Sequence, residues 1–251
     1  MNLKMTLAYD GTSYFGWQTA DGHPSIEDTL QTILEKILQQ KTPLQAASRT
    51  DAGVHAEGQV VNFVLEKERD LGRLYKSLNQ LLPRDIRVVD LKIALDDFHP
   101  TLDAKSKEYH YYLSHTKIQS PFERLFSWHC PFFPLDIKKI KTAASLFLGK
   151  HDFQALSNTT SEKPKNTVCT LYRLDTIFNE LSLQPLRFEI HGNRFLYKMV
   201  RNLVGTLIGI GRGTLSLDTA RKLIEGKIQR AFAGITAPAH GLILKKVMYD
   251  S

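Results

Sequence analysis

Two rounds of strand-like and helix-like apolar patterns run along this chain, and they restrict the folds open to it. Near the N-terminus Leu3, Met5 and Leu7 alternate with polar residues, as expected for a half-buried strand. The next apolar residues recur every three or four positions, which predicts a helix. Ser25 is suited to be the N-cap of that helix, and Pro43 lies just beyond its end.

The same two patterns predict the remaining elements. Strands are predicted at residues 59–65, 86–92, 108–114, 167–178, 186–190 and 242–249. Helices are predicted at residues 71–82, 137–148, 194–208 and 217–224. The polar segment 157-SNTTSEKPKNT-167 lacks apolar periodicity and is predicted to be a mobile loop. Strands and helices in two similar rounds predict an α+β protein with two halves, residues 1–105 and 106–251.

The charge balance leaves the type of partner open. Lys and Arg number 33 against 26 Asp and Glu, which gives a formal charge of +7 and a pI of about 9.3. Such a chain is suited to nucleic acid, because each Lys or Arg that meets a phosphate releases counterions, but a solvated basic surface would have the same count. No apolar stretch is long enough to span a membrane and no signal peptide is evident, so we expect a cytoplasmic protein. Cys130 and Cys169 lack paired spacing and are predicted to be free thiols.

Motifs for cofactors and metals are missing from the sequence. The segment 209-GIGRGT-214 follows a predicted helix and lacks the third glycine of a dinucleotide fingerprint, so a helix end and turn is the better interpretation. GxxxxGK[ST], HExxH and GxSxG do not occur. The nine histidines do not have metal-ligand spacing. The sequence therefore predicts neither a cofactor nor a metal.

The stretch 46-AASRTDAGVHAEGQVVNFVL-65 carries the most unusual carboxylate. Asp51 follows Arg49 by two residues and precedes Gly53 in a loop between predicted strands, a place where functional residues are often carried. The alternative is a turn in which Asp51 accepts hydrogen bonds from the amides of Gly53 or Val54. The local sequence alone favours the turn.

The strand 107-KEYHYYL-113 is rich in tyrosine. Alternation places Tyr109 and Tyr111 on one face and Tyr112 on the other. With Lys107 beside them, exposed tyrosines could stack on an unpaired base. Packing of each tyrosine in the core is equally open.

The predicted helix at 194–208 has a basic side. At about 100° per residue, Arg194, Lys198 and Arg201 fall within one narrow arc, opposite the apolar residues. This stripe would suit a phosphate backbone or a buried acidic partner, whereas a plain solvated face is the alternative.

Seven stretches of the chain, in the same order, resemble the TruA family of tRNA pseudouridine synthases. They are 9-YDGTSYFGWQ-18, 48-SRTDAGVHAEGQVVNF-63, 78-LNQLLPRDI-86, 97-DFHP-100, 107-KEYHYYL-113, 199-MVRNLVGTLIGIGRG-213 and 236-TAPAHGLIL-244. The resemblance implies the pseudouridine synthase fold: two ferredoxin-like α+β halves with mixed or antiparallel sheets that form a central basic cleft. It also implies a homodimer that acts on the anticodon arm of tRNA.

The resemblance further implies the roles of individual residues. Asp51 would be the catalytic carboxylate, and Tyr109 would stack on the target base. Arg49 and Arg201 would be active-site arginines, with Arg201 placed to pair with Asp51. The remaining basic residues predicted to contact RNA are Lys107, Arg194 and Lys198.

The implied reaction converts uridine to pseudouridine at tRNA positions 38, 39 or 40. It is an isomerisation, so it requires neither a metal nor a redox cofactor. There are two alternatives. One is a non-catalytic tRNA-binding or folding protein, and the other is an N-glycosidase that releases the base. Ser48 stands where many family members have Gly, and Thr101 where Arg is common. We expect these two departures to affect substrate choice, since neither involves Asp51.

Overall fold

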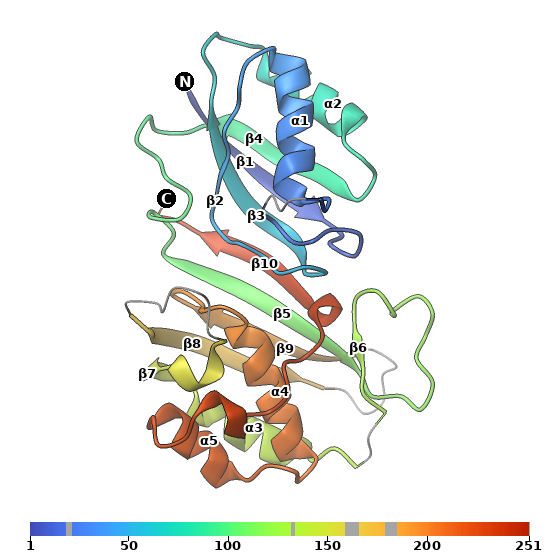
Figure 1. The fold of residues 1–251 in the computed structure, drawn as a ribbon, viewed down its shortest axis with the longest axis vertical. Helices are drawn as coiled ribbons and strands as arrows, with labels where there is room; N and C mark the ends of the chain where they lie inside the picture. The colour runs from blue at the N-terminus through green and yellow to red at the C-terminus, as the bar shows by residue number, and fades with distance from the viewer. Residues whose placement is uncertain (19–21, 132–133, 159–165, 179–184, 251) are drawn as a thin grey trace. The chain divides into compact units, whose positions relative to one another are not determined.

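The computed structural model describes residues 1–18, 22–131, 134–158, 166–178 and 185–250, and these fold as two compact units (Figure 1). One unit comprises residues 1–105 and the chain from Ile243 onward, and the other comprises residues 106–242. The predicted division assigned residues 243–251 to the second half. The structure differs there, because Ile243 and Leu244 pair in parallel with His55 and Ala56 of the first unit.

The first unit is a sheet with two helices. Its elements are β1 (Asn2–Tyr9), α1 (Ile26–Leu38), β2 (Gln45–Ala46), β3 (His55–Val64), α2 (Leu71–Leu81), β4 (Ile86–Ile93) and β10 (Leu242–Met248). The strand order is β4-β1-β3-β10, with β1 antiparallel to both neighbours and β2 paired with β3. Leu3, Met5 and Leu7 are fully buried, as the alternation predicted. The Ser25 hydroxyl accepts from the amide of Asp28, which confirms the predicted N-cap.

The second unit is a mainly antiparallel sheet with three α-helices and three short 3-10 helices, labelled η, among its described residues. Its elements are β5 (Ser106–Ser114), β6 (Trp128–His129), α3 (Ile137–Leu146), β7 (Gly149–Asp152), η1 (Gln154–Leu156), β8 (Val168–Ile177), β9 (Leu186–Gly192), α4 (Met199–Gly211), α5 (Leu217–Ile224), η2 (Arg230–Phe232) and η3 (Ala239–Gly241). The strand order is β5-β9-β8-β7, and β6 pairs in parallel with β5. The predicted α+β class is therefore confirmed.

Helix α4 corrects one prediction. The helix begins at Met199, not at Arg194, because Lys198 adopts a left-handed conformation (φ 58°) directly before it. Arg194 lies in the connection from β9, where its guanidinium donates to the carbonyl of Asn166. Since α4 is buried at most of its positions, the predicted stripe of Arg194, Lys198 and Arg201 along one helix face is wrong.

Two further predictions concern loops and membranes. Most of the loop predicted at 157–167 falls on residues 159–165, which lie outside the described residues. Across the described part of the chain, no helix has both the length and the apolar character that crossing a membrane requires.

Candidate active site

Asp51 lies half-buried on the loop that leads into β3. Gly53 has a φ of 76°, a conformation that favours glycine. The amide of Gly53 donates to the carbonyl of Tyr14 at 3.2 Å, and the amide of Val54 donates to the main-chain carbonyl of Asp51 at 3.1 Å. The turn interpretation supposed that the Asp51 carboxylate accepts from one of these amides. Both amides have main-chain acceptors instead, so neither requires the carboxylate.

A second loop, residues 10–17, is hydrogen-bonded to the Asp51 loop. The amide of Trp17 donates to the carbonyl of Thr50 at 3.0 Å. At the end of β1, the hydroxyl of Tyr9 lies 2.8 Å from the Thr50 hydroxyl, and both groups are buried. With the Gly53–Tyr14 bond, these contacts hold the backbone on both sides of Asp51.

Two glycines allow the main chains of these loops to touch. A Cβ at Gly11 would lie 2.1 Å from the carbonyl oxygen of Val54. A Cβ at Gly16, whose φ is 95°, would lie 2.5 Å from the carbonyl oxygen of Thr50. Only glycine fits such approaches without a backbone shift, so the sequence DGTSYFG is adapted to the Asp51 loop.

A buried histidine ties the start of β3 to the same loop. His55 has 2% of its surface exposed, and its Nδ1 lies 3.0 Å from the amide of Gly11 and 3.1 Å from Oδ1 of Asp10. An unprotonated Nδ1 accepts from Gly11, whereas a protonated Nδ1 donates to Asp10. In either protonation state the ring connects β3 to the 10–17 loop.

A buried tyrosine fixes the far side of that loop. The Tyr14 hydroxyl donates to Oδ1 of Asp85 at 2.8 Å. Burial and this hydrogen bond raise the pKa of Tyr14, so the side chain stays a neutral donor. The amide of Asp10 also donates to the carbonyl of Asp85 at 2.9 Å. The loop is thus anchored at both ends.

Arg49 is exposed, two residues before Asp51. No described residue forms an ion pair with its guanidinium or accepts a hydrogen bond from it. Its guanidinium is therefore not engaged by the part of the chain that the structure describes.

The two departures from the family pattern are accommodated differently. Ser48 is buried, and its main chain bonds to the side-chain amide of Gln59, while its hydroxyl has no partner among the described residues. The hydroxyl of Thr101 donates to the carbonyl of Ala46 at 2.7 Å, so this side chain makes an internal contact.

The tyrosines of β5 are mostly core residues. Tyr109 is 8% exposed and packs edge-on against Phe195, with ring centroids 5.1 Å apart. Tyr111 is fully buried and donates to the carbonyl of Pro238 at 2.8 Å. The interpretation of an exposed stacking surface is therefore wrong for Tyr111, while the role of Tyr109 stays a prediction.

Lys107 begins the same strand and is half-buried. Burial lowers the pKa of its ammonium group from 10.5 to about 8. Its expected contact with RNA stays a prediction.

We expect Lys107→Met to stabilise the protein below pH 8. The pKa of the lysine is about 8 in the folded chain and 10.5 in the unfolded chain, so charging it opposes folding. This penalty is complete below pH 8, shrinks as the pH rises to 10.5 and then vanishes. Urea unfolding should show a gain of about 2 kcal/mol at pH 7 and none near pH 10.5. An equal gain at both pH values would contradict the assignment.

Arg201 lies in the first turn of α4. Its Nε donates to the carbonyl of Ala237 at 2.7 Å, and the amide of Ala237 donates to the Arg201 carbonyl at 3.1 Å. Asp51 and Arg49 belong to the first unit, and Tyr109 and Arg201 to the second. The convergence of these two sets on one uridine, including an Arg201–Asp51 pair, stays a prediction.

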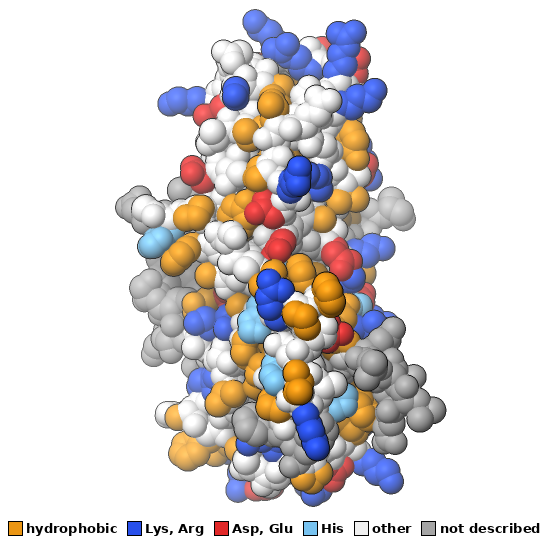
Figure 2. Space-filling view, turned by 90° about the vertical axis from the view of Figure 1, so that its right-hand side faces the viewer, with side chains coloured by type: hydrophobic (Ala, Val, Ile, Leu, Met, Phe, Trp, Pro, Cys, Tyr) orange, Lys and Arg blue, Asp and Glu red, His pale blue; other side chains and the backbone are white. Residues whose placement is uncertain are grey.

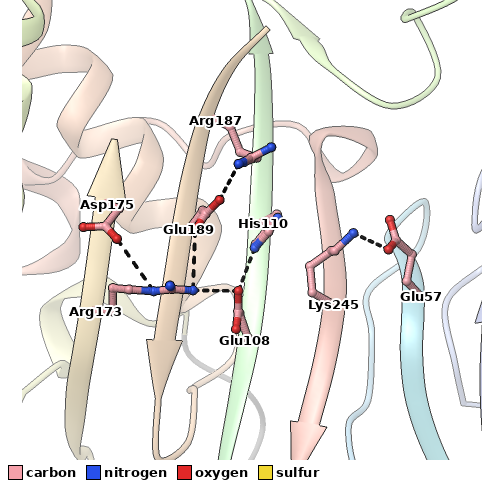
Figure 3. A network of polar contacts seen from close by, with 8 residues as sticks. All are labelled: Glu57, Glu108, His110, Arg173, Asp175, Arg187, Glu189 and Lys245. Carbon is pink, nitrogen blue, oxygen red and sulfur yellow. Dashed lines mark hydrogen bonds and ion pairs between the residues drawn. The ribbon is translucent and has the colours of Figure 1, made fainter. Parts of the chain in front are cut away.

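One cluster of the second unit has the geometry of a metal site. Ligand atoms of Glu108, His110 and Glu189 lie within 4.8 Å of one another. However, Arg173 lies 2.7 Å from Glu108 and 3.5 Å from Glu189, and Arg187 lies 2.5 Å from Glu189 (Figure 3). Two guanidinium groups already neutralise the carboxylates, so the cluster is better described as an ion-pair network.

The charge of Glu108 agrees with that description. Burial alone would raise its pKa, but the hydrogen bond with His110 and the charge of Arg173 lower it below the usual value. On the face drawn in Figure 2, Lys and Arg side chains are scattered among hydrophobic and acidic ones.

A comparison with protein families identifies the chain. The model of a tRNA pseudouridine synthase family matches residues 5–101 and 143–250, which include the Asp51 loop and most of both units. The chain belongs to the tRNA pseudouridine synthase family. As a member of this family it is an isomerase that acts on tRNA, in agreement with the resemblance found in the sequence.

Curated relatives match over nearly the whole chain. tRNA pseudouridine synthase A 2 of Protochlamydia amoebophila is 48% identical over 250 residues, which cover 99% of this chain and 94% of that protein. tRNA pseudouridine synthase A of Thermodesulfovibrio yellowstonii is 40% identical over 255 residues, or 99% of this chain and 100% of that protein. Among solved structures, a chain of a Cbf5-Nop10-Gar1 complex is 13% identical with a TM-score of 0.40, covering 94% of this chain and 59% of that chain.

The motifs of this tRNA pseudouridine synthase contain residues that sequence reasoning did not single out. Tyr9, Gly11 and Gly16 hold the Asp51 loop, and His55 joins the 10–17 loop to β3. All four lie in motifs of the family, 9-YDGTSYFGWQ-18 and 49-RTDAGVH-55. The two closely spaced glycines were the one available signal, since a loop seldom needs both unless another backbone approaches it.

Proposed function

We propose that this protein isomerises uridine to pseudouridine at positions 38, 39 and/or 40 of the tRNA anticodon stem-loop, with Asp51 as the catalytic carboxylate. The observation that carries this proposal is the bracing of the Asp51 loop. Five anchors hold it: the contacts at Tyr9, Gly11, Tyr14, Gly16 and Trp17. A carboxylate that must meet one atom of a substrate benefits from such a fixed backbone.

The proposed reaction requires a carboxylate and a turned base. The C1′–N1 bond of the uridine breaks, the uracil rotates, and C5 joins C1′ while the hydrogen on C5 leaves as a proton and N1 takes up a proton. Asp51 acts as a nucleophile on the sugar or the base, or as a base at the sugar. Each path preserves all atoms of the nucleotide except for exchange of that proton with water.

The target uridine must first leave its stack, which costs a few kcal/mol. In this proposal Tyr109 stacks on the extruded base, while Arg49 and Arg201 contact the nucleotide. Lys107, Arg194 and Lys198 would contact phosphates elsewhere on the tRNA. These assignments are supported by the family motifs in which Arg49, Tyr109 and Arg201 lie.

We further propose that the protein acts in the cytoplasm and that it is a homodimer. The dimer is proposed because the family that the motifs resemble binds one tRNA across two subunits. Sedimentation equilibrium should give twice the chain mass of 28.6 kDa at micromolar concentration. A monomer that retains full activity would contradict this part of the proposal.

Activity can be tested directly with unmodified tRNA. Transcripts that carry uridine at only one of positions 38, 39 and 40 should acquire pseudouridine, mapped by sequencing after chemical modification. Free uracil would indicate an N-glycosidase, and binding without any product would indicate a tRNA-binding protein. Either result from the parent protein would overturn the proposed isomerisation.

We expect Arg49→Ala to impair tRNA use without affecting folding. The side chain is exposed and makes no described internal contact, so the melting temperature should change by less than about 1 °C. Loss of a contact to RNA should reduce kcat/KM at least about tenfold. Exposed Arg73, on helix α2, provides the matched control, and Arg73→Ala should leave kcat/KM unchanged. Equal kinetics for both variants would remove Arg49 from the site.

A further inference from the structure

Residues 229–238, here called the strap, are bonded to the start of helix α4. The amide of Ala237 donates to the Arg201 carbonyl at 3.1 Å, and Nε of Arg201 donates back to the Ala237 carbonyl at 2.7 Å. Because the Nε hydrogen lies in the guanidinium plane, this bond orients that plane. Next to it, Tyr111 donates to the carbonyl of Pro238.

Asn202 is the centre of the contacts between the strap and the rest of the unit. It is fully buried and uses both side-chain donors, on the carbonyl of Leu156 and on Oδ1 of Asn158, each at 2.8 Å. Its Oδ1 accepts from Arg230 at 2.8 Å and from Thr236 at 2.7 Å. The amide is therefore fully satisfied, and any replacement leaves buried polar groups without partners.

Arg230 braces the strap from within. Its Nη1 donates to the carbonyl of Gly234 at 2.8 Å, and its Nη2 donates to the hydroxyl of Thr236 at 2.9 Å as well as to Asn202. The Gly234 amide donates to the hydroxyl of Thr206 on α4 at 3.0 Å. One guanidinium thus joins two other residues of the strap, Gly234 and Thr236, to Asn202 of the helix.

The two largest apolar side chains of the strap contribute little burial, although the small Ala237 is fully buried. Phe232 and Ile235 expose 62% and 63% of their surface. The strap backbone nevertheless touches α4, because a Cβ at Gly205 would lie 1.8 Å from the Ile235 carbonyl oxygen. The polar contacts of Arg230, Thr236 and Asn202 therefore act together with this backbone contact to hold Ala237 in place.

We propose that Arg230, Thr236 and Asn202 are positioning residues that act through Ala237 to aim the guanidinium of Arg201 at the RNA. This inference rests on the proposed function, in which Arg201 contacts the target nucleotide. None of the three residues touches the substrate in this account. A displacement of about 1 Å in a group at the reacting centre can cost about 100-fold in rate, so small shifts of the strap should be visible in kinetics.

The test compares Arg230→Lys, Thr236→Val and the double variant with the parent protein. Thr236→Val keeps the side-chain shape and removes one hydroxyl. Arg230→Lys keeps the charge and removes the planar guanidinium that bonds several acceptors at once. The rate constant of a single turnover on saturating tRNA should fall about tenfold in each, with the Kd for tRNA within about twofold. The double variant should lose less than the product of the two single losses, because both act through one network.

Lys222→Met is the control for loss of a cation in the same unit. It removes an exposed ion pair with Asp218 on α5, and its single-turnover rate constant should equal that of the parent. The inference would be overturned if Arg230→Lys and Thr236→Val fold and keep the rate constant of the parent, even if their melting temperatures fall. A purely structural role predicts that result. A loss that appears only in Kd would overturn the inference too. A parent protein without pseudouridine activity would overturn the proposed function instead.

Discussion

Asp51→Asn should abolish pseudouridine formation while the protein stays folded. The substitution keeps the size of a half-buried side chain, so the loop contacts of Thr50, Gly53 and Val54 should persist. A neutral amide can act neither as the nucleophile nor as the base that the reaction needs. We expect the rate constant to fall by at least about three orders of magnitude, since loss of a catalytic nucleophile has effects of this size or larger.

The matched control is another carboxylate of the same unit. Asp97 is exposed, and Asp97→Asn should leave both the rate constant and the melting temperature unchanged. Asp51→Asn with a rate within tenfold of the parent would remove Asp51 from the reaction. Circular dichroism and tRNA binding of Asp51→Asn should match the parent, which separates loss of chemistry from loss of folding.

Gly16→Ala should impair both stability and catalysis. Its φ of 95° strains any residue with a Cβ, and that Cβ would lie 2.5 Å from the carbonyl oxygen of Thr50, next to Asp51. The strain alone costs about 1–3 kcal/mol. The clash must also move one of the two loops, so we expect the rate constant at saturating tRNA to fall about 100-fold.

Gly22 provides a control with the same strain and no clash. Its φ is 77°, and no described atom beyond its chain neighbours lies within 4 Å of the position that a Cβ would take. Gly22→Ala should therefore be destabilised by about 1 kcal/mol in urea unfolding, with little change in the rate constant. Equal kinetic losses at both glycines would show that backbone strain, and not the contact with the Asp51 loop, explains the effect.

Much of the fold follows from local patterns in the sequence. The strand predicted from the alternation of Leu3, Met5 and Leu7 and the helix cap predicted at Ser25 were both confirmed. Both depend on nearby residues, because alternation buries one face of a strand and a cap accepts hydrogen bonds from the first amides of its own helix. The Asp51 loop was singled out by its family motif, whereas its local composition alone favoured a plain turn, and its role in the reaction stays a prediction.

Other features depend on contacts distant in sequence. The 194–208 helix prediction failed at its start because Lys198 adopts a left-handed conformation directly before Met199, which the spacing of apolar residues does not reveal. The place of residues 243–250 is determined by pairing with β3, nearly 190 residues earlier, which no local pattern encodes. Likewise, Arg230 and Thr236 gain significance only because the strap meets Asn202.

The central claim is that Asp51 isomerises uridine without releasing the base, and tritium at C5 tests it most directly. Formation of the C5–C1′ bond expels the C5 hydrogen, so tRNA labelled there should release one tritium to water for each pseudouridine formed. Asp51→Asn should release none above background, while Asp97→Asn should match the parent. Labelled uracil in solution, no release by the parent protein, or equal release by Asp51→Asn would contradict the account.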